Sequence, residues 1–246
     1  MITEEGCSYL YSALKNIQNQ SLKLKELDLR YNHPGAKGRK KLFNKTEKLR
    51  LDHAGEDRIK SGPKKYACKL TLDPNTAHRL LSLSEGNRKV EGMKEEKSYP
   101  DHPERFSHSM QVLCRESLTG RCYWETEWND GIGGGVNIAV AYKSVGRKCK
   151  NNGFGENEKS WSLSCCGRYY DVSHNDISTN IRPSSMPNRV GVYVDCEAGI
   201  LSFYSVSTDT QPLKHIHTFT TTFTEPVYAG FRVWDSTSSV RLCQID

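Results

Sequence analysis

Long apolar segments are missing from this sequence of 246 residues. No run of apolar residues approaches the roughly 18 that a membrane-spanning helix requires. The first residues, MITEEGCSYLY, also lack the basic start and the apolar block of a secretory signal. The sequence therefore predicts a soluble, cytoplasmic protein without membrane insertion. Its 36% hydrophobic and 26% charged residues favour a folded globular chain over a disordered one.

Closely spaced cysteines are missing as well, although the chain contains nine. A structural zinc site needs ligand pairs such as C-x-x-C, and none occurs. His215 and His217 would share one face of a strand, but no third metal ligand is identifiable, so we expect a polar edge face and no metal. The cysteines are expected to be mostly reduced, buried thiols, with a disulfide or a reactive thiol as the alternative. They are Cys7, Cys68, Cys114, Cys122, Cys149, Cys165, Cys166, Cys196 and Cys243.

Catalytic motifs are also absent. The sequence has no G-x-S-x-G nucleophile motif, and the histidines between residues 78 and 174 have no neighbours typical of a catalytic triad. The glycine-rich stretch NDGIGGGVN, residues 129–137, resembles a phosphate-binding loop. Such a loop lies at the start of a helix, but the sequence that follows here, VNIAVAY, has the pattern of a strand. We therefore expect a flexible hairpin loop there, no cofactor and no enzymatic activity.

The net charge of +6 is unevenly distributed. Residues 1–99 hold 21 Lys and Arg against 13 Asp and Glu, whereas residues 100–246 hold 14 against 16. A basic run such as KGRKK, residues 37–41, can attract phosphates, but it has no interleaved aromatic residues that could stack bases. The favoured interpretation is a solvated linker, without nucleic acid as a partner.

The first 50 residues combine a helical pattern with a leucine-rich pattern. In EEGCSYLYSALKNI apolar residues recur at spacings of three and four, which is typical of an amphipathic helix, and Thr3 is placed to act as its N-cap. Residues 24–32 then fit L-x-x-L-x-L-x-x-N, the leucine-rich-repeat signature, with Leu24, Leu27 and Leu29 as its leucines and Asn32 as its asparagine. Because about three repeats are needed for a stable stack, we expect residues 1–50 to be a terminal repeat and basic linker that follow further repeats upstream.

Beyond the basic linker the apolar pattern alternates with period two, as in KYACKLTLD, GGVNIAVAYK and PVYAGFRVW. Short strands with turn residues between them, and no long helical pattern, predict an antiparallel β-sandwich. The chain is thus expected to be mainly β, with a short α/β segment in front. The predicted core consists of Leu72, Leu81, Val112, Tyr123, Trp128, Ile138, Val140, Trp161, Leu163, Val192, Val194, Leu201, Phe203 and Phe231.

Three motifs together resemble a known family. LDPNTAHRLLSLSEGNRKV, CYWETEW and VGVYVDCEAGILSFYSV resemble successive landmarks of the PRY-SPRY, or B30.2, domain, a jelly-roll-like sandwich. The resemblance covers residues 52–246, with PRY at about 52–100 and SPRY at about 101–246. In this family DCEAG corresponds to an acidic hairpin turn between two core strands, where Gly199 can take a positive φ. This stretch is therefore predicted to be scaffold.

A leucine-rich segment running into a PRY-SPRY domain resembles the C-terminal end of the NACHT–leucine-rich-repeat (NLR) receptors of bony fish, which are similar to NLRC-type innate sensors. The resemblance implies a non-catalytic module that recognises a protein or peptide, at the end of a longer receptor chain. No NACHT domain is present in these residues. Two alternatives stay open, namely the substrate-recognition end of a tripartite-motif ubiquitin ligase and the C-terminal domain of a stonustoxin-like pore-forming protein.

The binding residues are expected on loops at one end of the sandwich and on the strand WSLSCCGRYY. With Trp161 and Leu163 pointing inward, alternation turns Ser162, Ser164 and Cys166 outward. By the family resemblance, Ser164 and Cys166 match positions where some relatives carry aromatic binding residues. Trp234 and Asp235, in RVWDSTSS, combine an aromatic residue with an acid, although Trp234 fits a core position equally well. The predicted partner-binding residues are Trp234, Asp235, Arg168, Tyr170, Ser164, Cys166 and Asp130.

Overall fold

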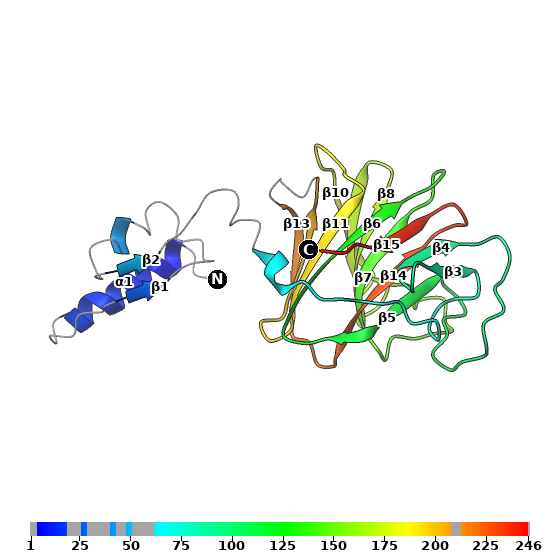
Figure 1. The fold of residues 1–246 in the computed structure, drawn as a ribbon, viewed down its shortest axis with the longest axis horizontal. Helices are drawn as coiled ribbons and strands as arrows, with labels where there is room; N and C mark the ends of the chain where they lie inside the picture. Colours follow the sequence, from blue (N-terminus) through cyan, green and yellow to red (C-terminus); the bar gives the residue numbers. More distant parts are fainter. Residues whose placement is uncertain are drawn as a thin grey trace. The chain divides into compact units, whose positions relative to one another are not determined.

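The computed structural model has two compact units, Met1–Gly62 and Pro63–Asp246 (Figure 1). The structure describes residues 4–18, 26–28, 40–42, 48–50, 62–207 and 213–245. Within these ranges, no helix combines the length and the apolar character that crossing a membrane demands.

The first unit contains the predicted helix, α1 (Glu4–Gln18), and a small parallel sheet. Cys7 and Leu14 of α1 are buried together with Leu42, and Leu27 packs against them. Leu27 belongs to β1 (Glu26–Asp28), which pairs in parallel with β2 (Lys48–Arg50) so that Leu27 lies opposite Leu49. The other positions of the predicted repeat signature, and the predicted cap Thr3, lie outside the described residues.

The second unit is the predicted antiparallel β-sandwich, which is confirmed. After a 3₁₀ turn, η1 (Pro63–Tyr66), its strands form a six-stranded sheet in the order β10-β9-β8-β7-β14-β5 and a seven-stranded sheet in the order β13-β12-β11-β6-β15-β4-β3. The first sheet contains β5 (Gln111–Leu118), β7 (Val136–Tyr142), β8 (Ser160–Cys166), β9 (Tyr169–His174), β10 (Ile177–Ile181) and β14 (Val227–Val233). The second contains β3 (Leu81–Ser84), β4 (Lys89–Gly92), β6 (Arg121–Asn129), β11 (Arg189–Asp195), β12 (Ile200–Ser205), β13 (Lys214–Thr220) and β15 (Ser239–Leu242).

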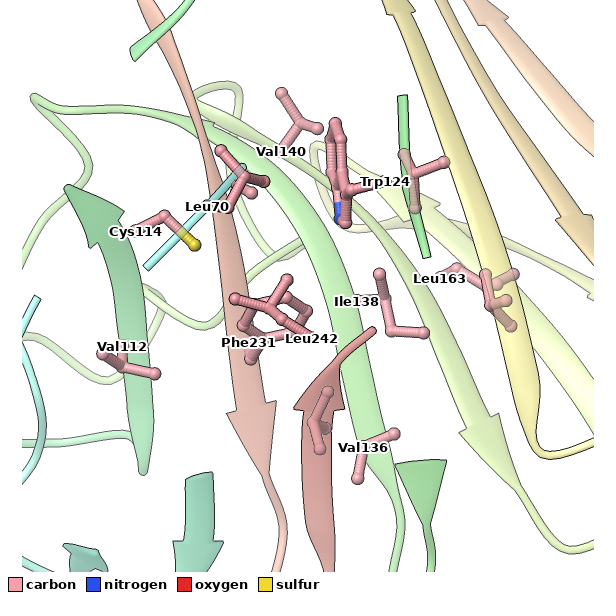
Figure 2. Close-up of a cluster of buried hydrophobic side chains, with 14 of the residues drawn as sticks. Leu70, Val112, Cys114, Trp124, Val136, Ile138, Val140, Leu163, Phe231 and Leu242 are labelled. Atoms are coloured by element: carbon pink, nitrogen blue, oxygen red, sulfur yellow. The ribbon is translucent and has the colours of Figure 1, made fainter. Parts of the chain in front are cut away.

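The hydrophobic core lies between the two sheets. In Figure 2, Ile138 of the six-stranded sheet and Trp124 of the seven-stranded sheet point into the same buried cluster. All of the predicted core residues are buried, and all except Tyr123 belong to this cluster. Tyr123 neighbours the inward-facing Trp124, so alternation turns it to the outer face of its sheet, where its hydroxyl donates to Glu125. Tyr123 is buried as predicted, but it is buried on the outer face of its sheet and not in the core between the two sheets.

The stretch VDCEAGILSFYSV forms the hairpin of β11 and β12, as predicted. Asp195 begins the turn, and its Oδ1 accepts the N–H of Ala198 at 3.0 Å. Gly199 ends the turn with a φ of +66°, in the left-handed region that glycine enters without steric cost. The acidic residue and the glycine thus shape the turn, which supports a scaffold role.

Strand β8 follows the predicted alternation, and its adjacent cysteines lie in different environments. Cys165 is fully buried in the core, where burial raises the pKa of its thiol well above the usual range. Cys166 is only partly buried, and its thiol donates to the carbonyl oxygen of Gly134. Because serine at position 165 would place an unsatisfied hydroxyl among apolar side chains, Cys165→Ser should lower the unfolding free energy by about 1–3 kcal/mol.

At position 166 the serine hydroxyl can keep the hydrogen bond to Gly134, so Cys166→Ser should change stability by less than about 0.5 kcal/mol. Urea unfolding of both variants measures the difference. Equal losses at the two positions would contradict the assignment of Cys165 to the core.

Candidate functional site

A row of polar side chains crosses the outer face of the six-stranded sheet, the face that points away from the core. Strand pairing places these residues opposite one another in successive strands. From β5 to β10 the row consists of Gln111, Arg232, Asn137, Ser164, Asp171 and Asn180. Side chains with hydrogen-bonding groups thus form one continuous row across all six strands of this sheet.

Trp234 follows β14 and lies two residues beyond Arg232, so alternation places it on the same outer face. Its indole Nε1–H donates to Oδ1 of Asn137 at 2.6 Å, and its backbone N–H donates to the carbonyl oxygen of Gly135 at 3.0 Å. The ring passes directly over Gly135, where an added Cβ would lie 2.8 Å from Cε3 of the tryptophan. Trp234 is nevertheless 42% exposed. The sheet therefore fixes the orientation of an aromatic ring that stays open to solvent.

Asn137 is held in turn by β8. Its Nδ2 donates to the hydroxyl oxygens of Ser164 at 2.7 Å and of Ser162 at 3.3 Å. The hydroxyl of Ser162 donates to the carbonyl oxygen of Phe154, in the segment between β7 and β8. Because both ends of the Asn137 amide are bonded, its oxygen is already directed at the indole before any ligand arrives.

The segment between β7 and β8, residues 143–159, closes one side of this face. Arg232 contacts Glu156 with a distance of 2.6 Å between Nη1 and Oε1, and the other carboxylate oxygen accepts the N–H of Gly153. Gln111 is fully buried beneath the segment and donates from Nε2 to the carbonyl oxygen of Asn152 at 2.8 Å. The segment is thus attached to β14 through Arg232 and to β5 through Gln111.

An open pocket of about 680 Å³ lies over this surface. It is lined by residues 108–110, by Lys150, Asn151 and Glu156, by Asp176 of the β9–β10 turn, and by residues 232–234. Cationic and anionic side chains therefore stand around an exposed indole. Such a pocket can bind an apolar or aromatic side chain and pair with polar groups on either side of it.

Two predicted binding residues have different roles in this surface. Trp234 is an exposed residue of the pocket and not a core tryptophan. Asp235 is its neighbour in sequence, but its Oδ1 accepts hydrogen bonds from the N–H and hydroxyl groups of Thr237 and Ser238. The hydrogen bonds from Thr237 hold the pKa of Asp235 below its usual value. Asp235 therefore shapes the loop that follows Trp234.

Four further predicted residues lie on or near β8. Ser164 faces outward as predicted, but it is buried and bonded to Asn137, whereas Cys166 is bonded to the loop before β7. Arg168 is exposed on the turn between β8 and β9, outside the pocket lining. Asp130 accepts the N–H of Gly167 at its Oδ2 and thereby ties that turn to the loop between β6 and β7.

The prediction for Tyr170 requires correction. Tyr170 is fully buried in the core cluster and does not reach the rim. Antiparallel pairing places it opposite Cys165, whose side chain points inward, and residues paired in this way share a face of the sheet. Its neighbour Tyr169, which lies opposite Cys166, is the exposed tyrosine of this turn.

Several residues of this site were missed from sequence: Arg232, Glu156, Lys150 and Asp176, which line the pocket, and Asn137, which orients Trp234. A signal existed for Arg232, because it alternates with Trp234 in FRVW and must share its face. Asn137, within the otherwise apolar VNIAVAY, was a second signal. The acidic and basic residues come from connecting segments whose path across the sheet cannot be read from local patterns.

The glycine-rich stretch forms the connection from β6 to β7 and leads into a strand, as predicted. His215 and His217 lie on β13, and the described residues contain no group of three or more His, Cys, Asp or Glu side chains placed to hold a metal ion.

A rigid β-sandwich with a preformed, partly aromatic pocket on one outer face is typical of domains that recognise other proteins. The SPRY domain matches residues 121–245, and PRY, the SPRY-associated domain, matches residues 70–118. The chain therefore belongs to the SPRY domain family, in the PRY-SPRY arrangement that its motifs predicted. SPRY domains are typically protein-interaction modules and are generally non-catalytic.

Individual relatives come from two groups of proteins. The chain is 45% identical to stonustoxin subunit beta of Synanceia horrida over 180 residues, which cover 71% of this chain and 25% of the toxin subunit. It is 40% identical to tripartite motif-containing protein 16 of Mus musculus, covering 73% of this chain and 32% of that protein. The chain thus spans only a quarter to a third of these relatives.

Solved structures support the same fold. A stonustoxin structure superposes with a TM-score of 0.66 at 39% identity, over 72% of this chain and 29% of that chain. The PSpry domain of TRIM65 superposes with the same TM-score at 25% identity, over 74% of this chain and 93% of that domain.

Proposed function

We propose that the chain recognises a protein or peptide segment through the pocket beside Trp234, as the non-catalytic recognition module of an NLR-like innate immune receptor. The observation that carries the recognition role is the exposed indole, which Asn137 and Gly135 hold in one orientation on a rigid sheet. An aromatic anchor whose rotamer is already fixed loses little conformational entropy when a partner binds. Such residues supply a large share of the binding free energy at protein interfaces.

The partner is a segment with an apolar or aromatic side chain that packs on Trp234. Arg232 and Glu156 are only partly exposed and neutralise each other, so they favour polar groups of either sign over a strongly charged ligand. Lys150, His108 and Asp176 stand around the pocket and can pair with flanking residues of the partner. The anchor thus contributes affinity, and the charged groups around it contribute specificity.

The first unit supports the proposed receptor context. β1 and β2 pair in parallel with Leu27 opposite Leu49, and the sequences KELDL and EKLRL around them are alike. Parallel strands from successive similar segments are typical of leucine-rich repeats. All nine cysteines are free, in keeping with a reducing cytoplasmic environment.

The toxin alternative is favoured by the identity to stonustoxin, and the ubiquitin-ligase alternative by the tripartite-motif relative. The full-length transcript separates the three contexts. An upstream NACHT domain and leucine-rich repeats would support the receptor, whereas an upstream RING and coiled coil would support the ligase.

The recognition role can be tested by selecting a displayed random peptide library against the full chain. Peptides enriched on the wild-type chain should bind Trp234→Ala at least about 30-fold more weakly, which corresponds to roughly 2 kcal/mol. The melting temperature should fall by only a few degrees, because the indole is exposed and donates a single hydrogen bond. Calorimetric titration and thermal melting measure the two quantities on the same samples.

Arg241→Ala provides a control on the other sheet, where Arg241 pairs with Glu127 and does not line the pocket. This variant should bind the selected peptides as the wild type does. Peptides that bind Trp234→Ala with undiminished affinity would show that recognition occurs elsewhere on the sandwich.

A further inference from the structure

Strand β10 is an edge strand of the six-stranded sheet, with β9 as its only strand neighbour among the described residues. Its sequence, ISTNI, contains no charged residue, and its first four residues are exposed. Ile177 is 74% exposed, which is unusual for isoleucine in a folded domain. Natural proteins commonly protect edge strands with charges, prolines or bulges, and β10 carries none of these.

The second sheet does not cover the first four residues of β10, whose side chains are exposed. His174 of β9 contacts Phe219 of β13 with ring centroids 6.4 Å apart, and β13 is the last strand of the seven-stranded sheet. β10 lies one strand further out than β9 in the six-stranded sheet. The side chains of residues 177–180 on both faces of β10, and its outer edge, are therefore open to a partner, whereas Ile181 packs against the core cluster.

The turn before β10 determines which backbone groups point outward. Asn175 and Asp176 form a two-residue turn with φ values of 51° and 60°, and His174 lies opposite Ile177. The residues that flank such a turn form a hydrogen-bonded pair, and bonded and non-bonded pairs then alternate along the strands. The backbone of Ile177, Thr179 and Ile181 thus points to β9, whereas that of Ser178 and Asn180 points to the open edge.

We propose that β10 pairs in antiparallel fashion with β10 of a second copy of this chain. With Thr179 opposite its own counterpart, each Ser178 lies opposite an Asn180, so the outward backbone groups of both copies form hydrogen bonds. Each exposed Ile177 then lies beside an Ile181, a cross-strand apolar pair.

Charge complementarity supports this register. Asp176 directly precedes β10 and the exposed Arg182 directly follows it, so the same alignment brings Asp176 of each copy to Arg182 of the other. The strand is therefore self-complementary in backbone, apolar contacts and charge, which a two-fold symmetric interface requires.

The pairing would create one continuous sheet across both copies. Its two-fold axis stands perpendicular to the sheet, so the outer faces of both copies lie on the same side. If the pocket beside Trp234 binds the partner, a consequence that rests on the proposed function, the dimer presents two such pockets for bivalent binding. The dimer itself does not depend on that function.

Sedimentation equilibrium of the full chain, from about 10 µM to 1 mM, tests the pairing. The mass should rise from 27.9 kDa toward twice that value, with a dissociation constant on the order of 100 µM because the interface is small. Ser178→Pro removes an outward N–H that β9 does not use, so it should weaken dimerisation at least about tenfold while the melting temperature stays nearly unchanged.

Two double variants separate self-pairing from capture of a foreign strand. Ser178→Lys with Asn180→Lys places like charges opposite each other in the dimer, whereas Ser178→Lys with Asn180→Glu places opposite charges there. The first should be monomeric and the second should dimerise at least as well as the wild type. A chain that stays monomeric at 1 mM, a Ser178→Pro dimer of unchanged strength, or equal behaviour of the two double variants would each overturn the proposal.

Discussion

Glu125→Ala should lower the free energy of unfolding of the sandwich by about 3–5 kcal/mol, the cost of breaking a buried ion pair by removing one partner. Glu125 lies on β6 with its side chain on the outer face of the seven-stranded sheet, and it is fully buried there. Its carboxylate lies 2.6 Å from Nε of Arg189 and 3.3 Å from Nζ of Lys64. Truncation would leave these largely buried cations without this counter-charge.

The carboxylate also accepts the hydroxyl of the buried Tyr123 at 2.7 Å. Burial and the neighbouring carboxylate raise the pKa of Tyr123 above its usual value, so the hydroxyl stays protonated as a donor. Lys64 belongs to η1, and the N–H of Cys68 donates to the carbonyl oxygen of Tyr123. Glu125 and Tyr123 therefore attach the first residues of the sandwich unit to its second sheet.

Glu127→Ala is the matched control, because Glu127 lies two residues further along β6 on the same face. Its partner Arg241 is 46% exposed, so loss of this surface pair should cost less than about 1 kcal/mol. Denaturant unfolding of both variants gives the comparison. Similar losses of unfolding free energy at positions 125 and 127 would contradict a special role for the buried contacts of Glu125.

Gly199→Ala should lower the free energy of unfolding by about 3 kcal/mol, for two additive reasons. The residue has a φ of +66°, which a side chain disfavours by about 1 kcal/mol. An added Cβ would also lie 1.7 Å from the carbonyl oxygen of Thr221, and this backbone atom cannot rotate away as a flexible side chain could. The hairpin of β11 and β12 would have to shift against the segment after β13.

Gly120→Ala isolates the steric contribution, because Gly120 has a similar φ of +58° but no atom within 4 Å of an added Cβ. It should cost only about 1 kcal/mol. Thermal melts of the two variants measure the difference between them, and equal losses would mean that the contact with Thr221 relaxes without cost.

The sequence predicted the sandwich because alternation with period two is a local consequence of strand geometry. Residues such as Ile138, Leu163 and Phe203 point to one side of their strands wherever those strands lie, and all three are buried in the core as expected. The same rule correctly separated Cys165 from Cys166. The helix over residues 4–18 followed in the same way from spacings of three and four.

Tyr170 and Tyr123 show where local patterns were insufficient. Alternation gives two faces to a strand, but the face that becomes core depends on pairing with its neighbours. The two-residue turn at Gly167 and Arg168 sets the register that brings Tyr170 opposite the inward Cys165. Tyr123 is buried because η1 and the residues after it cover an outer face, and no pattern within CYWETEW indicates that cover.

By itself, the sequence determined the class of fold, most of the inward side chains, the turn at Gly199 and the family of the domain, since each depends on residues close together in the chain. The tertiary structure alone decided that Trp234 is an exposed pocket residue, that Asp235 is occupied by its own loop and that β10 is an exposed edge strand of its sheet. These depend on contacts between distant segments, such as Trp234 with Asn137, and on which strand ends each sheet. Burial of an individual side chain depends on what covers it, and the covering segments are placed only when the whole chain has folded.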